Sequence, residues 1–275
     1  MSSIAANGGM ARSTGSGLAL RVLSAAALIP LVLALLWVGG WPFVGLVALV
    51  AVLMGVEWHQ LTLGDLDREA MGTVVFMAGA VLLFPMTPVW AGPLVLAIGA
   101  AAALLKTDAA QRTWRLLPFV WLGLPALALV WLRLQPDIGI WLVGWVLATV
   151  WASDTGAYFS GRAIGGPKLA PRISPNKTWA GLIGGMVAAA VAGGAVSGWG
   201  GYAILPEAAL SAVVAALSQG GDLAESALKR HFNVKDSGKL IPGHGGILDR
   251  VDALLVAVPA AALLYAASQG RLPLW

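Results

Sequence analysis

The sequence predicts an all-α, polytopic integral membrane protein with about nine transmembrane helices and a cytoplasmic N-terminus. Two observations predict this class. Hydrophobic residues make up 59% of the 275 positions and charged residues only 11%, whereas a soluble globular domain has about 25% charged residues. The chain also contains successive apolar stretches of about 20 residues, the length that crosses a bilayer as a helix.

The composition limits the chemistry as well. The chain has no cysteine, which excludes disulfides and cysteine-ligated metal sites. Its thirteen tryptophans suit a membrane protein, because tryptophan favours the membrane–water interface. The formal net charge of +4 is modest, and we expect no nucleic-acid partner.

Each predicted element follows from the apolar pattern. Residues 1–17 are polar and rich in Gly and Ser, and we expect a disordered tail, not a cleaved signal peptide. Transmembrane helices fill the N-terminal part, 18–135, and the functional site is expected in the C-terminal part, 136–275, with cytoplasmic loops at 160–177 and 229–247. The predicted spans are 18–38, 41–61, 71–88, 90–106, 116–134, 138–159, 178–199, 206–228 and 248–268.

The distribution of basic residues supports this arrangement. With nine spans, fifteen of the seventeen lysines and arginines fall on one side of the membrane, and only Arg133 and Arg271 fall on the other. The positive-inside rule places the basic side in the cytoplasm. A miscounted helix would mix the two sets, so the separation is independent support for nine spans.

Four acidic residues are expected to face one another at the cytoplasmic ends of the last two spans. Asp222 and Glu225 are three positions apart, as are Asp249 and Asp252, so each pair shares one helical face. Ionisable residues at membrane depth indicate function by default. Hard oxygen ligands without cysteine favour Mg²⁺ over zinc. The alternative is a structural ion-pair network with nearby lysines and arginines. Glu57, beside Trp58 and His59, is interpreted as an interfacial residue.

The loop at 229–247 combines cations with glycines. Lys229, Arg230, Lys235 and Lys239 precede a Gly-rich turn that contains Gly245 and Gly246 and leads into a predicted helix near residue 247. Consecutive backbone N–H groups at such a turn can bind phosphate, although acids at a helix start are also good caps. His244 lies between glycines and is a candidate base or phosphate ligand, with a structural role as the alternative.

The loop at 160–177 is the second basic segment. It follows Asp154 and contains Ser174 and Lys177. The sequence Ser-Pro-Asn-Lys-Thr predicts the start of a helix after Thr178. Positive-inside anchoring and attraction to anionic lipid are the alternative explanation for its cations.

These segments resemble the signature of the phosphatidate cytidylyltransferases. The match extends over residues 226–230, 235–238 and 241–252, with the sequences SALKR, KDSG and IPGHGGILDRVD. The segment 153–178 is similar to a second block of the same family, and Ala180 stands where the family usually has glutamate. The N-terminal half matches only as apolar spans.

The resemblance implies an enzyme that transfers CMP from CTP to phosphatidic acid, giving CDP-diacylglycerol and pyrophosphate. It implies Mg²⁺ with room for a second cation, a homodimer, and a bacterial inner-membrane location with the active site facing the cytoplasm. The expected catalytic residues are Asp249, Asp222, Lys229 and His244. The expected metal ligands are Asp222 and Asp249, supported by Asp252 and Glu225. The expected substrate-binding residues are Arg230, Lys235, Lys239, Gly245, Gly246, Arg250, Lys177, Ser174 and Asp154.

Two other functions are compatible with parts of the pattern. A related CTP-using lipid enzyme, such as a polyprenol kinase or an archaeal-lipid cytidylyltransferase, would use a different acceptor. A transporter would also contain intramembrane acids, but transporters place them near the midplane of both halves of a repeated fold. Here the acids cluster in one half and no repeat is visible, which disfavours transport.

Overall fold

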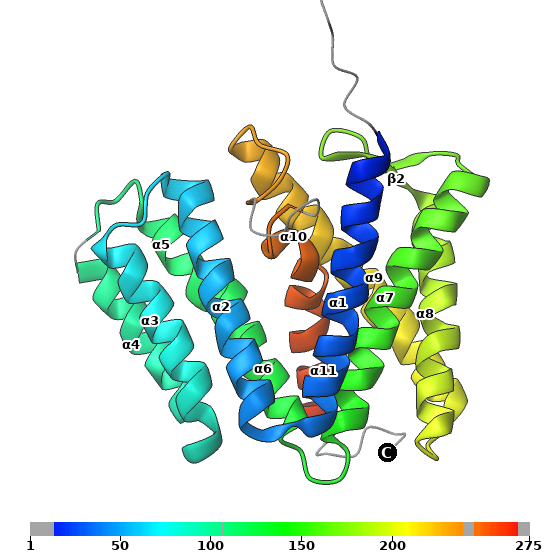
Figure 1. Ribbon diagram of the computed structural model, residues 1–275, viewed down its shortest axis with the longest axis horizontal. Helices are drawn as coiled ribbons and strands as arrows, with labels where there is room; N and C mark the ends of the chain where they lie inside the picture. The colour runs from blue at the N-terminus through cyan, green and yellow to red at the C-terminus, as the bar shows by residue number, and fades with distance from the viewer. Residues whose placement is uncertain (1–13, 106, 239–244, 269–275) are drawn as a thin grey trace, which may run out of the picture.

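A computed structural model describes residues 14–105, 107–238 and 245–268, and these residues form helices that run between two ends of the molecule (Figure 1). The N-terminal part comprises α1 (Thr14–Val38), α2 (Gly40–Leu63), α3 (Arg68–Leu83), η1 (Phe84–Met86), α4 (Ala91–Leu105), α5 (Arg112–Pro118), η2 (Phe119–Gly123) and α6 (Leu124–Arg133). The C-terminal part comprises α7 (Gly139–Ala163), β1 (Lys168–Ala170), β2 (Ser174–Thr178), α8 (Trp179–Trp199), α9 (Ile204–His231), α10 (Leu248–Val251) and α11 (Leu254–Ala267).

The helices have the lengths and compositions of a membrane protein. Among the described residues, five helices are long and apolar enough to cross a membrane: Gly40–Leu63, Arg68–Met86, Arg112–Arg133, Trp179–Trp199 and Ile204–His231. Three shorter apolar helices accompany them: Ala26–Val38, Ala91–Leu105 and Leu254–Ala267. The prediction of a helical membrane protein is therefore supported, and the count of nine spans stays a prediction.

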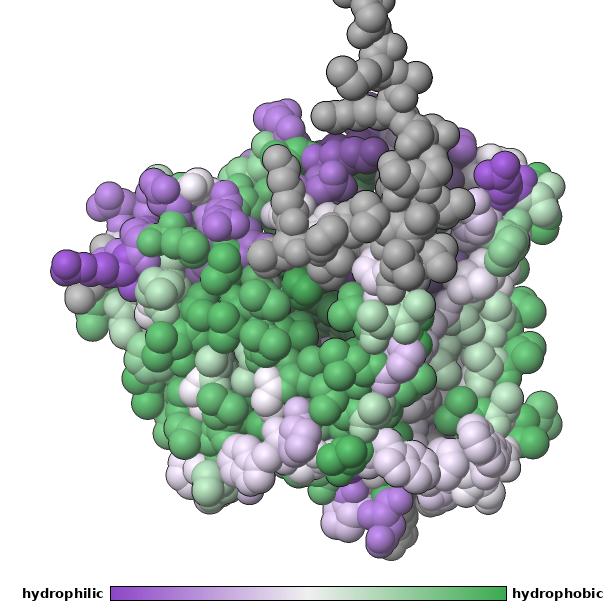
Figure 2. Space-filling view, in the orientation of Figure 1, coloured by the Kyte–Doolittle hydropathy of each residue, from purple (hydrophilic) through white to green (hydrophobic). Residues whose placement is uncertain are grey.

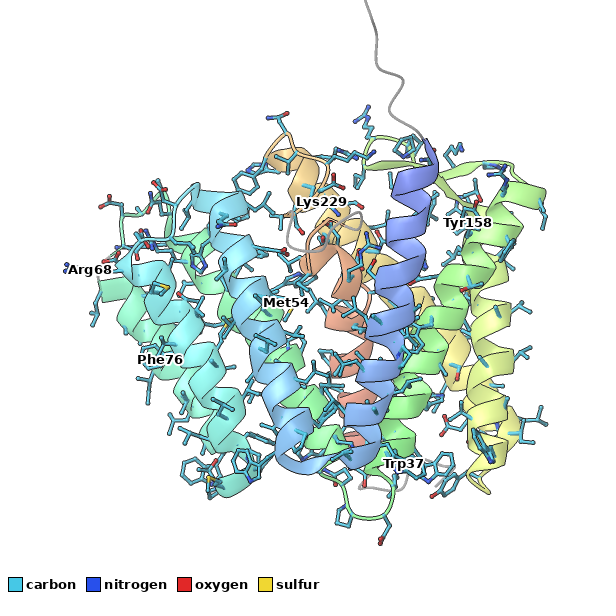
Figure 3. The ribbon with its side chains drawn as sticks, in the orientation of Figure 1. Trp37, Met54, Arg68, Phe76, Tyr158 and Lys229 are labelled. Carbon is cyan, nitrogen blue, oxygen red and sulfur yellow. The ribbon has the colours of Figure 1, made fainter. Side chains whose placement is uncertain are left out.

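Polar side chains gather at one end of the molecule. Figure 2 shows hydrophilic residues over the α2–α3 connection and the end of α9, with a broad hydrophobic surface over the helices below. We call this the polar end and define it by residues 64–68, 164–178 and 229–238. Trp37 lies at the opposite end in Figure 3.

The polar end contains a β-hairpin, so the prediction of an all-α protein is wrong in this detail. β1 and β2 pair antiparallel, with Lys168 opposite Thr178 and Ala170 opposite Ser174. Proline at 167, 171 and 175 disfavours helix in this segment. The predicted helix start is confirmed, because the Thr178 hydroxyl accepts a hydrogen bond from Gly181 N at 3.0 Å and caps α8.

Glycines allow α7 and α8 to pack closely together. A Cβ atom at Gly156 would overlap the side chain of Ala188 and lie 2.8 Å from the carbonyl oxygen of Gly184. A Cβ atom at Gly185 would lie 2.8 Å from the carbonyl oxygen of Ser153. This close approach places the residues around Asp154 on α7 against the start of α8.

The last two predicted spans are joined by the signature loop. α9 covers the predicted span 206–228, and the predicted span 248–268 is divided into α10 and α11 at Asp252–Ala253. The connection brings the start of α10 back against the polar end of α9, where Figure 1 shows the two elements side by side.

Candidate active site

One group of charged residues joins β2, α7 and α9. Lys177 on β2 places its Nζ atom 2.6 Å from Oδ2 of Asp222 on α9 and donates a hydrogen bond to Oε1 of Gln219 at 3.0 Å. The Nε2 atom of Gln219 donates to Oδ1 of Asp154 on α7 at 3.3 Å. The segment 153–178 therefore meets α9 at Gln219 and Asp222, a few residues before the signature begins at Ser226.

A pocket of about 600 Å³ opens at this junction. Its walls combine acids with basic and neutral polar groups, a mixture that suits a phosphate together with a cation. Figure 3 shows Tyr158, one of the lining residues, on α7 near the polar end. The lining residues are Asp154, Ala157, Tyr158, Gly161, Arg162, Leu169, Asn176, Lys177, Thr178, Gly181, Leu182, Gln219 and Asp222.

A second group centres on Lys229, which lies where α9 faces α10 in Figure 3. Its Nζ atom lies 2.5 Å from Oδ1 of Asp249 and 3.2 Å from Oε1 of Glu225. The Glu225 carboxylate is buried, and Lys229 is its ion-pair partner. The structure thus brings Lys229 together with two of the predicted metal ligands.

Asp249 also fixes the signature loop to α10. Its Oδ2 atom accepts hydrogen bonds from Ser237 N at 2.9 Å, Ser237 Oγ at 2.9 Å and Gly246 N at 3.0 Å. Every oxygen of this carboxylate therefore has a protein donor. The Gly246 amide, predicted to contribute to a phosphate-binding turn, donates its hydrogen bond to Asp249 here.

The interpretation of Glu57 as an interfacial residue is wrong. Its side chain is fully buried, and its carboxylate accepts hydrogen bonds from Ile247 N and Leu248 N at 2.9 Å each. The signal was present in the sequence, because a lone acid within an apolar span costs about 2.5–3.5 kcal/mol unless it has partners. The sequence did not show that those partners were backbone amides almost two hundred positions away.

The remaining predicted residues lie around these two groups. Arg230 donates to the carbonyl oxygens of Ile173 at 3.4 Å and Val234 at 3.0 Å, which ties the hairpin to the end of α9. Asp252 accepts a hydrogen bond from Ala253 N at 2.8 Å. Lys235 and Arg250 are exposed, and Ser174 begins β2. Lys239 and His244 lie outside the described residues.

The donor set fits a divalent cation, although it does not form a complete protein shell. Among the described residues, no group of three or more histidines, aspartates or glutamates is arranged to hold a metal ion. Asp222 lies beside Lys177, and Asp249 and Glu225 lie beside Lys229. Mg²⁺ usually takes only one or two protein carboxylates and completes its shell with water and substrate phosphates, so a bound ion would share these carboxylates with the two lysines.

The fold and site together define a multi-helix membrane protein whose charged pocket suits phosphate-containing substrates. The sequence profile of the cytidylyltransferase family matches residues 19–268. The chain therefore belongs to the cytidylyltransferase family, whose members are nucleotidyltransferases.

Individual relatives of the chain are phosphatidate cytidylyltransferases. A phosphatidate cytidylyltransferase of Brucella suis is 42% identical over 262 residues, covering 91% of this chain and 93% of the relative. A phosphatidate cytidylyltransferase of Rickettsia bellii is 31% identical over 253 residues, covering 89% of each chain. One from Haemophilus influenzae is 44% identical over 156 residues, covering 54% of each chain.

Proposed function

We propose that this protein transfers CMP from CTP to phosphatidic acid, forming CDP-diacylglycerol and pyrophosphate at the cytoplasmic face of a bacterial inner membrane. The observation that carries the proposal is the pocket at the polar end, where Lys177 of the 153–178 segment pairs with Asp222 on α9. Relatives that cover nine-tenths of the chain are named for this activity. A pocket at the end of apolar helices lets the acyl chains stay in the bilayer while the phosphate reaches polar groups.

The chemistry requires positioning more than acid–base catalysis. An oxygen of the phosphatidic acid phosphate attacks the α-phosphorus of CTP. A new P–O bond forms, the bond to the bridging oxygen breaks, and pyrophosphate leaves with the electron pair. The nucleophile is already an anion, so no strong base is needed. The barrier then falls through alignment of the two phosphates and neutralisation of their charges.

The cations of the site supply that neutralisation in the proposal. Lys177 faces the pocket directly, and Lys229 is held in place by Asp249 and Glu225. Arg230, Lys235, Lys239 and Arg250 lie along the same loop and α10 in the sequence, and we assign them to the phosphates. Ser174, Asp154, Gly245, Gly246 and His244 complete the proposed substrate-binding and catalytic set.

The same proposal includes Mg²⁺, with Asp222 and Asp249 as its first ligands and Asp252 and Glu225 in support. When bound, the ion would be held by these carboxylates and would supply positive charge that neutralises the reacting phosphates. Asp222 pairs with Lys177, and Glu225 and Asp249 share Lys229, so the carboxylates that would hold the ion lie together with the two lysines proposed to neutralise phosphate charge.

The orientation, the nine spans and the homodimer belong to this proposal too. Arg133 supports the predicted orientation. Its Nε atom donates to Leu36 O at 2.9 Å, beside Trp37, which lies at the end opposite the polar end in Figure 3. This is the side on which the sequence placed Arg133, away from most of the basic residues. The homodimer follows from the family resemblance and can be measured by light scattering of the protein in detergent.

A radiolabel assay tests the function. Purified protein in liposomes would receive CTP labelled in the cytidine, phosphatidic acid and Mg²⁺. Label entering the lipid phase with equimolar pyrophosphate is the expected result. Folded protein that leaves the label in water would reject phosphatidic acid as the acceptor. Release of CDP with polyprenol as acceptor would instead identify a lipid kinase.

A further inference from the structure

Glu57 connects the N-terminal helices to the signature loop. It lies on α2, and its fully buried carboxylate accepts hydrogen bonds from the backbone N–H groups of Ile247 and Leu248 at 2.9 Å each. These amides belong to the start of α10, where N–H groups have no acceptor within the helix. Burying a carboxylate costs free energy unless it is hydrogen-bonded or ion-paired. The Glu57 carboxylate and the amides at the start of α10 therefore satisfy each other's hydrogen-bonding requirements.

Glu57 and Asp249 share one turn of backbone. The amide of Gly246 donates to Asp249 at 3.0 Å, and the next two amides donate to Glu57. The hydroxyl of Ser237 lies 2.9 Å from Oδ2 of Asp249 and 3.4 Å from Oε2 of Glu57. A shift of the Glu57 carboxylate would therefore move the groups that orient Asp249.

Two glycines of the signature loop leave just enough room for this carboxylate. A Cβ atom at Gly238 would lie 2.5 Å from Oε1 and 2.7 Å from Cδ of Glu57. A Cβ atom at Gly246 would lie 2.6 Å from Oε2. Real Cβ atoms do not approach this closely. Any larger side chain at Gly238 or Gly246 would therefore displace the Glu57 carboxylate or the loop.

We propose that Glu57 is a positioning residue for the cytidylyl transfer. It holds the turn at 246–248, and through it the orientation of Asp249 and of Lys229, which pairs with Asp249. Glu57 itself does not touch substrate. This inference rests on the proposed function of the site, although its structural part can be measured without activity.

Hydrogen exchange provides that separate measurement. In Glu57→Gln, the new amide group faces backbone donors, so only one of the two hydrogen bonds can be kept. We expect the amides of Ile247 and Leu248 to exchange at least about tenfold faster, while those of α3 are unchanged. Unchanged exchange at both amides would overturn the proposal. Hydrogen exchange tests the positioning of the turn even in a protein that does not transfer CMP. Absence of CMP transfer by the wild-type protein would instead reject the proposed function.

Steady-state kinetics tests the positioning role. We expect Glu57→Gln to lower kcat by on the order of a hundredfold, with KM for CTP changed far less, because misplacement of catalytic groups mainly affects the reacting geometry. Glu207→Gln is the matched control, since Glu207 is also fully buried but lies on the first turn of α9, away from the polar end. A kcat within about twofold of wild type for folded Glu57→Gln protein would overturn the proposal.

A double-mutant cycle removes the dependence on one variant. Gly238→Ala keeps the carboxylate but displaces it, so it also tests the role if Glu57→Gln does not fold. We expect the double variant to lose no more activity than the more impaired single variant, because both changes disrupt one arrangement. Losses that multiply would show independent effects and would overturn the proposal.

Discussion

The Nζ atom of Lys177 lies 2.6 Å from Oδ2 of Asp222. This ion pair joins the β-hairpin before α8 to the polar end of α9, and both residues line the pocket. A lysine and a carboxylate in contact beside a pocket can exchange partners when a phosphate and a cation enter. The lysine then pairs with the phosphate, and the carboxylate binds the cation. We therefore assign this pair as the point where substrate phosphate and metal enter in the proposed reaction.

Replacing Lys177 by methionine should lower kcat/KM for CTP by about a hundredfold, since a charged contact to phosphate contributes about 1.5–3 kcal/mol. Methionine keeps the length and apolar stem of the side chain but removes its charge. Steady-state assays in liposomes would measure the loss. Lys168→Met is the control, because Lys168 lies on the same hairpin and is exposed outside the pocket. Equal activity of both variants would exclude Lys177 from substrate binding.

Asp249→Asn should reduce kcat by at least about a hundredfold while the protein stays folded. The neutral amide removes the ion pair with Lys229 and can replace only part of the hydrogen bonding to Ser237 and Gly246. The control is Asp137→Asn, an exposed position with φ of 62°, a conformation that asparagine tolerates. Full turnover by folded Asp249→Asn protein would refute both the metal and the catalytic assignment.

Removing divalent cations should abolish CMP transfer. EDTA is expected to stop turnover in the liposome assay, and added Mg²⁺ should restore it, because the four phosphate groups of CTP and phosphatidic acid bring negative charge beside the carboxylates of the site. Thermal unfolding measured in parallel would show whether EDTA acts on the site or on the fold. Turnover that continues in EDTA would contradict the metal proposal.

Gly156→Ala should destabilise the protein by about 1–3 kcal/mol, because the added methyl group would overlap Ala188 and push α7 away from α8. The pocket lies between these helices, so activity should fall as well. Gly144→Ala is the matched control and should leave stability nearly unchanged, since Gly144 is also on α7 but a Cβ atom there meets nothing within 4 Å. Thermal unfolding followed by tryptophan fluorescence would compare the two variants.

Stability at low pH should depend on Asp67, which caps α3 and pairs with Arg115. The Arg115 guanidinium lowers the pKa of Asp67 from 3.8 to about 2. Because the pKa is lower in the folded chain, the stabilisation is complete above about pH 4 and is lost as the pH falls towards about 2.

The Asp67→Asn variant provides the comparison for that pH dependence. Its Tm should lie below that of the wild type at pH 6, and the difference should shrink as the pH falls through the range in which Asp67 becomes protonated. A Tm difference that does not change with pH would show that the ion pair does not stabilise the fold.

The amino-acid sequence by itself determined the class of the protein and the region of its site. Apolar stretches of spanning length require helices in a membrane, because backbone polar groups must be satisfied within the segment. The i, i+3 spacing of Asp222 and Glu225 was enough to place both on one side of a helix, and the Thr178 cap was predictable from local chemistry.

Only the tertiary structure decided which charges meet. Lys229 pairs with Asp249 and Lys177 with Asp222 because α9 packs beside both α10 and the hairpin, and no local pattern specifies such partners. The hairpin itself depends on pairing across a short turn within a predicted loop. Glu57 shows the same limit most clearly. Its acid was visible in the sequence, but its acceptor role depends on amides about 190 positions away that only chain packing brings within 2.9 Å.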